Sequence, residues 1–115
     1  MKARGLIAFY QIYSKILNKK QIKFDLIIFN PPYLPIDNRE PKESQLATTG
    51  GKFGSEIINK FLNQAKNYSK PTTKIFLITS SLTKEVNFEG YKKEIVGRKK
   101  VFFEGLIAWK LEIIR

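Results

Sequence analysis

The sequence predicts an α/β fold in which parallel strands are followed by a C-terminal antiparallel hairpin. Residues 24–29 and 74–79 are apolar runs of strand length. The segment between them contains a polar loop and a helical pattern, which is the order of a right-handed crossover unit. Two more strand-like stretches, about 93–102 and 106–114, follow each other closely, as the arms of a hairpin do. The 115 residues are expected to form one small domain.

The N-terminal segment is predicted to be an amphipathic helix over residues 4–18, because apolar side chains recur at helical spacing: Leu6, Phe9, Tyr13, Ile16 and Leu17. A loop, residues 18–21, leads into the first strand, 23–29. The outer edge of this strand is expected to be open. The helix could shield it, a second polypeptide could pair with it, or the isolated chain could aggregate. The last two outcomes are favoured, because a helix cannot satisfy a row of strand hydrogen bonds.

The middle of the chain is predicted to be a long loop, then a helix, then a buried strand. Residues 31–54 are rich in proline, glycine and polar side chains, and a loop of this length is usually functional or mobile. Ser55 is the predicted N-cap of a helix that extends to about Tyr68. Pro71 ends that region, and residues 74–79 form an almost wholly apolar strand of the parallel kind.

The C-terminal part is predicted to lack another helix. Residues 83–92 include Asn87 and Gly90 and are too few for a full helix before the hairpin begins. Trp109, in the second arm, is expected to be a core or sheet-face residue.

Composition excludes several classes of site. The chain has no Cys and no His, so disulfides and thiolate metal sites are ruled out and a transition-metal site is not expected. The longest apolar stretches are far shorter than a membrane span, and no signal-peptide pattern is present. We therefore expect a cytoplasmic protein that does not contact a membrane.

The net charge of +11 raises the possibility of a nucleic-acid partner. Residues 24–58 are the least basic part, however, whereas a polyanion that crosses this segment would favour the reverse. The densest basic patch is formed by Lys92, Lys93, Arg98, Lys99 and Lys100. It can be a solvated strand edge, where lysines discourage pairing with other chains, or a contact with RNA or the ribosome.

Asn30-Pro31-Pro32-Tyr33 directly follows the first strand and is the candidate catalytic site. An amide or amino nitrogen is a poor nucleophile, so a site that modifies one must hold its hydrogens on acceptors. The Asn30 side-chain carbonyl and a backbone carbonyl at Pro31 can serve as these hydrogen-bond acceptors. The two prolines fix the backbone in advance, and Tyr33 offers a face for stacking. The simpler alternative is a turn that only terminates the strand.

This motif resembles that of class I S-adenosylmethionine-dependent methyltransferases acting on amide or amino nitrogens. The flanking blocks resemble the HemK-like release-factor glutamine methyltransferases, in their shorter archaeal and eukaryotic branch. These blocks are residues 24–28 before the motif, Leu34-Pro35 after it, the glycine loop 50–54, the strand region 75–83 and the hairpin region 101–107. The resemblance implies the C-terminal half of a Rossmann-like methyltransferase sheet. Residues 1–22 would then be an N-terminal helix and loop, and residues 23–115 the substrate-side half of one truncated domain.

The cofactor-binding residues of such an enzyme are unknown here. The fold holds its cofactor with a glycine-rich turn and an acidic residue at the end of the following strand, and residues 1–23 contain only Gly5 and no acid. The loop at 50–54 lacks the spacing of either phosphate-binding motif and is interpreted as a flexible substrate-side loop. S-adenosylmethionine is therefore the implied cofactor, but it is not expected to bind this chain alone.

Three functions remain open. The chain can be the substrate half of a glutamine methyltransferase that acts on a peptide-chain release factor, inactive alone. It can be a fragment of a nucleic-acid adenine amino-methyltransferase, or a non-catalytic basic module that binds RNA or protein. The implied partners are a release factor, a complementing N-terminal half and, by resemblance to the shorter branch, a small zinc-binding activator protein. Asp25 is expected to have a structural or supporting role, and Glu40 and Glu43 to lie in a solvated loop or contact a substrate.

Overall fold

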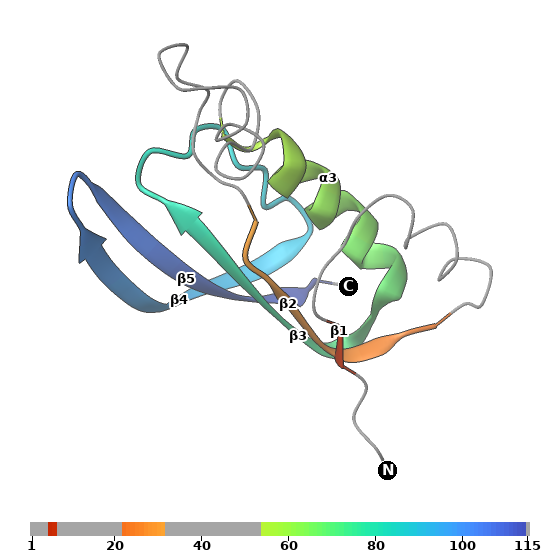
Figure 1. Ribbon diagram of the computed structural model, residues 1–115. Coiled ribbons are helices and arrows are strands. Elements are labelled where there is room, and N and C mark those ends of the chain that lie inside the picture. Colours follow the sequence, from red (N-terminus) through yellow and green to blue (C-terminus); the bar gives the residue numbers. More distant parts are fainter. Residues whose placement is uncertain (1–4, 7–21, 32–53, 115) are drawn as a thin grey trace.

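The computed structural model describes residues 5–6, 22–31 and 54–114. Within them, five strands form one sheet in the order β1-β2-β3-β5-β4, and helix α3 covers one face of it (Figure 1). The elements are β1 (Gly5–Leu6), β2 (Phe24–Phe29), α3 (Glu56–Ala65), the 3-10 turn η1 (Lys66–Tyr68), β3 (Ser69–Ser80), β4 (Tyr91–Val101) and β5 (Glu104–Ile113). Strands β2 and β3 are parallel, and β5 is antiparallel to both β3 and β4. The predicted partial Rossmann-like α/β fold with a C-terminal hairpin is confirmed.

Strand β1 pairs in parallel with β2 at the edge that was predicted to be open, with Gly5 opposite Leu26 and Leu6 opposite Ile27. For Gly5 and Leu6 the prediction of a helix over 4–18 is therefore wrong, and its other residues lie outside the described part of the chain. The physical reason is that an unpaired strand edge presents a row of backbone donors and acceptors. Satisfying these groups outweighs the helical spacing of a few apolar side chains.

The core lies between α3 and the sheet. The side chains of Ile58, Phe61 and Leu62 on α3 are buried, as are those of Ile27 and Ile75 on the strands below them. Ser55 is the N-cap residue, as predicted. Its backbone carbonyl accepts a hydrogen bond of 2.7 Å from the Asn59 N–H, although its hydroxyl makes no capping bond.

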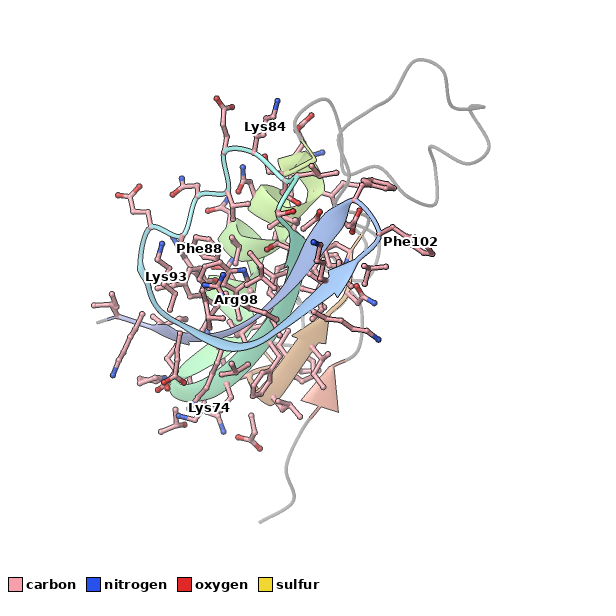
Figure 2. All side chains as sticks on the ribbon, turned by 90° about the vertical axis from the view of Figure 1, so that its left-hand side faces the viewer. Lys74, Lys84, Phe88, Lys93, Arg98 and Phe102 are labelled. Carbon is pink, nitrogen blue, oxygen red and sulfur yellow. The ribbon has the colours of Figure 1, made fainter. Side chains whose placement is uncertain are left out.

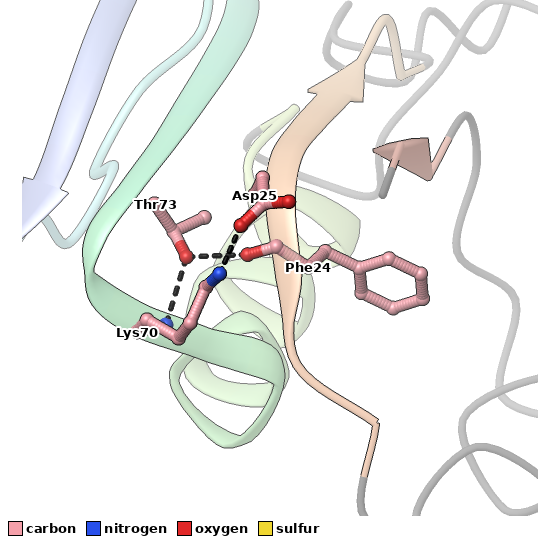
Figure 3. Close-up of polar contacts among 4 residues, drawn as sticks. All are labelled: Phe24, Asp25, Lys70 and Thr73. Carbon is pink, nitrogen blue, oxygen red and sulfur yellow. Dashed lines mark hydrogen bonds and ion pairs between the residues drawn. The ribbon is translucent and has the colours of Figure 1, made fainter. Parts of the chain in front are cut away.

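Strand β3 begins earlier than predicted, at Ser69, so that Pro71 lies inside the strand. The pairing of β2 with β3 is irregular there, since Phe24 is opposite Ser69 but Leu26 is opposite Lys74. The Thr73 hydroxyl donates to the Phe24 carbonyl at 2.5 Å and accepts from the Lys70 N–H at 2.8 Å (Figure 3). A side chain thus satisfies backbone groups that the regular ladder would pair, which is how the strand accommodates proline.

The segment between β3 and β4 contains no helix, as predicted, and packs against the hairpin through aromatic rings. The Phe88 and Trp109 ring centroids are 4.8 Å apart. The Lys93 ammonium lies 4.8 Å from the Phe88 centroid (Figure 2). The Trp109 indole N–H donates to the Thr79 hydroxyl at 2.8 Å, and its ring packs against the core from a partly buried position. Its predicted place on the sheet face is confirmed.

On the other face of the sheet, Ile28 is 46% exposed. Within the described ranges, no helix is both long and apolar enough to cross a membrane.

Candidate acceptor-binding site

Asn30 and Pro31 lie immediately after the carboxyl end of β2. Phe29, the last strand residue, is buried, and its ring centroid is 4.4 Å from that of Phe61 on α3. Asn30 is exposed, whereas Pro31 is buried. The strand is therefore anchored up to the residue before the motif, and the first motif residue is accessible. Pro32 and Tyr33 lie outside the described residues.

The beginning of α3 lies at this same edge of the sheet (Figure 1). Gly54 is buried and has a φ of 84°, a conformation that glycine adopts without steric cost. Ser55 is also buried. Gly54, the last residue of the glycine loop predicted at 50–54, thus forms a bend that leads into α3, and the loop's other residues are outside the described ranges.

The turn after β3 completes the described part of this edge. The Thr83 N–H donates to the Ser80 carbonyl at 3.0 Å, and the Leu82 N–H donates to the Ser80 hydroxyl at 3.1 Å. Ser81 then connects the turn to the hairpin: its N–H donates to the Gly105 carbonyl at 2.7 Å, and its hydroxyl accepts from the Gly105 N–H at 2.9 Å. These bonds fix the hairpin next to the carboxyl end of β3.

The single charged residue of β2, Asp25, lies near its other end. Asp25 forms an ion pair with Lys70 across β2 and β3 (Figure 3), so its predicted structural role agrees with its position. The groups whose pKa is displaced are also remote from this edge. Burial raises the pKa of Tyr68 and of Tyr91, and a hydrogen bond from Lys74 lowers the pKa of Glu112.

The basic residues predicted to be a patch lie on β4, the outer strand of the sheet. Lys92, Lys93, Arg98, Lys99 and Lys100 are all exposed there. The interpretation as a charged strand edge agrees with this position, and a contact with RNA or the ribosome stays a prediction.

Sequence comparison identifies the class of protein. The profile of the Eco57I restriction-modification methylase family matches residues 4–101, so the chain belongs to this family of methylases. It is 40% identical over 116 residues to a protein of Methanocaldococcus jannaschii assigned as an N5-glutamine methyltransferase, with 91% of this chain and 58% of that protein covered. It is 42% identical over 72 residues to the release factor glutamine methyltransferase of Borreliella burgdorferi, with 57% of this chain and 25% of that protein covered. The resemblance to glutamine methyltransferases is confirmed. The chain spans little more than half the length of the Methanocaldococcus jannaschii protein.

Two solved structures have the same fold. The structure of the E. cuniculi Mtq2-Trm112 complex, described as responsible for methylation of the termination factor eRF1, superposes with a TM-score of 0.58 at 22% identity. That match covers 79% of this chain and 52% of the other. The methyltransferase SMU.776 in complex with SAH superposes with a TM-score of 0.51 at 14% identity, over 90% of this chain and 30% of the other. At these identities the likeness concerns the fold.

The described residues do not fit a complete cofactor site. Two residues of β1 occupy the position beside β2, but the described ranges contain no glycine-rich turn after β1 and no carboxylate at the end of a strand next to it. Such a turn and carboxylate are what hold the cofactor in this type of fold.

Sequence reasoning missed the exposed hairpin tip. The predicted first arm, 93–102, includes Phe102, but β4 ends at Val101, and Phe102 and Phe103 form the turn. The sequence did contain a signal: the two predicted arms, 93–102 and 106–114, follow each other so closely that the reversal of the chain must lie at or next to Phe102 and Phe103.

Proposed function

We propose that the chain forms the acceptor-holding part of an S-adenosylmethionine-dependent N-methyltransferase that methylates a glutamine of a peptide-chain release factor. The observation that carries this proposal is the exposed Asn30 after the parallel strand β2, next to the buried Pro31. Ligands of open α/β sheets bind outside the carboxyl ends of the strands. The names of the curated relatives supply the chemical identity of the acceptor.

The proposed role of Asn30 is to orient the substrate amide. Its side-chain carbonyl and the backbone carbonyl of Pro31 accept hydrogen bonds from the NH2 of the glutamine, and Tyr33 stacks on the plane of the amide. Positioning of this kind supplies a large share of the rate enhancement in transfer reactions. The methyl group comes from the sulfonium of the cofactor, which residues other than those described must hold.

The rival acceptor is an adenine amino group, which is also a planar NH2. The name of the matching family, which refers to restriction-modification methylases, is the observation in its favour. The exposed basic strand β4 is remote from Asn30 in the strand order, so it does not favour one acceptor over the other.

The test is a methyl-transfer assay with the chain combined with a cofactor-binding half, tritiated S-adenosylmethionine, and either the release factor or an adenine-containing DNA duplex as acceptor. We expect label in the release factor and a loss of at least about 100-fold with Asn30→Ala, because the amide then loses an oriented acceptor. Asn63→Ala, an exposed asparagine on α3, is the matched control and should leave the rate unchanged. Label in DNA alone, or full activity of Asn30→Ala, would contradict the proposal.

A further inference from the structure

The tip of the β4–β5 hairpin exposes two adjacent phenylalanines to solvent. Phe102 is 91% exposed and Phe103 is 76% exposed. Figure 2 shows the Phe102 side chain projecting from the end of the hairpin, with Arg98 on the strand that leads to it. Neither ring contributes to the buried core, and adjacent exposed apolar side chains are a feature of interaction sites.

The backbone at the tip also conflicts with the residue it carries. Phe102 has a φ of 50°. In a two-residue hairpin loop this position favours Gly, which has no β-carbon, or Asn and Asp, whose short polar side chains tolerate a positive φ; a large apolar side chain is strained there. Glycine at position 102 would therefore strain the backbone less than Phe102 does.

The tip lies beyond the same sheet edge as the acceptor site. Ser80, the last residue of β3, is opposite Leu106, so Phe102 and Phe103 extend about 10 Å past the end of β3 at about 3.3 Å per residue. Two strand spacings separate β2 from β5 in the sheet, which places the hairpin about 10 Å to the side of Asn30. A small substrate at Asn30 cannot reach the tip, whereas a protein substrate can touch both.

The surroundings of the tip define the chemistry of its partner. The two rings line a surface groove of about 600 Å³ together with Arg98, Lys99 and Lys100. Aromatic and arginine side chains are typical anchors of protein interfaces, and the cations require an acidic complement. A second copy of the chain is disfavoured by its net charge of +11. Glu104 also lines the groove, so the groove is of mixed charge and partly apolar, which suits a protein segment better than a nucleic-acid backbone.

We infer that the hairpin tip is a docking surface for an acidic, partly apolar segment of the protein substrate, separate from the segment that carries the methylated glutamine. The inference rests on the proposed function for the identity of that substrate. Phe102 and Phe103 anchor the segment through their rings, and the basic side chains of β4 select its charge. The tip thereby acts on substrate affinity, while Asn30 acts on the reacting amide.

The test measures binding of the fluorescently labelled release factor to the full chain by anisotropy, without cofactor. We expect the double variant Phe102→Gly/Phe103→Ser to weaken binding at least about 10-fold, as loss of anchor residues does. The matched control is Ile114→Ser, which removes a side chain that is 61% exposed at the opposite end of the hairpin and should leave binding unchanged. Lys99→Glu should weaken binding more than Lys92→Glu, because only Lys99 belongs to the groove.

The outcomes separate the two proposals. If the release factor binds and the double variant binds equally well, the docking surface is overturned and the proposed function stands. If the wild-type chain does not bind the release factor, both are overturned. A labelled 20-nucleotide uridine RNA is the second probe. RNA binding that depends on Phe102 and Phe103, with unchanged release-factor binding, would assign the tip to nucleic acid and contradict the inference.

Discussion

Phe102 illustrates how a single residue can serve a contact at the expense of the fold. Its ring is almost fully exposed, and its φ of 50° lies in the region that L-residues avoid. Asn30 is another exposed residue at the end of a strand, but it is followed by a buried proline. At both positions, local structure directs a side chain toward solvent rather than into the core.

Phe102→Gly should stabilise the chain, because glycine adopts a positive φ without strain and no buried contact is lost. We expect the free energy of unfolding in urea to rise by about 1 kcal/mol. Phe103→Gly is the control and should not stabilise, because the gain depends on the positive φ of position 102. Equal effects at both positions would show that the backbone conformation of Phe102 is not the cause.

At the scale of elements, Tyr91 connects the beginning of β4 to α3. Its buried hydroxyl donates to the Leu62 carbonyl at 2.5 Å. Lys66 adds a cation-π contact, with its ammonium 5.5 Å from the Tyr91 ring centroid. The edge strand that carries the hairpin is thus fixed to the helix at the end opposite the tip.

Tyr91→Phe should lower the free energy of unfolding by about 1 kcal/mol, the usual net value of one hydrogen bond. Burial raises the pKa of Tyr91 above its ordinary value of 10.0, so folding favours the protonated phenol. This contribution to stability is fully present below pH 10.0 and declines as the pH rises above it, because the unfolded chain then loses the proton first. The free energy of unfolding in urea, measured at several pH values between about 8 and 11, follows this decline. The slope should be smaller in the variant, and identical slopes would exclude Tyr91 as its source.

The sequence predicted the elements whose local signals agree with their tertiary role. Strand β2 and the position of Asn30 follow from an apolar run that ends in two prolines. Helix α3 follows from its apolar face and from Ser55. The misses arise where long-range pairing decides the structure: Gly5 and Leu6 pair with β2, and Thr73 lets β3 begin before Pro71. The hairpin tip was assigned to a strand because the pairing register cannot be seen in one arm alone.

At the scale of the whole molecule, the described sheet carries Asn30 just after the carboxyl end of β2 and basic side chains on its outer strand β4, and helix α3 covers one face. The chain matches 58% of the length of its relative from Methanocaldococcus jannaschii. The described residues contain the exposed Asn30 but no cradle for the methyl donor. We therefore expect the chain to bind the acceptor protein without binding the methyl donor.

Isothermal titration of the full chain with S-adenosylmethionine should show no measurable binding, because residues 1–23 contain no acid and only one glycine before the motif. Addition of a polypeptide that carries a glycine-rich strand-turn-helix should restore binding. S-adenosylmethionine binding to the chain alone with micromolar affinity would show that residues other than those expected form a cofactor site.

Trp109 is the single tryptophan of the chain, and its surroundings make it a spectroscopic probe of one particular junction. Its indole N–H donates to Thr79 on β3, its ring contacts Phe88, and its backbone belongs to β5. Intrinsic fluorescence of the unlabelled chain therefore reports on the joining of the hairpin to the parallel part of the sheet. Emission that changed while the helical circular dichroism signal persisted would identify separation of the hairpin as a distinct step of unfolding.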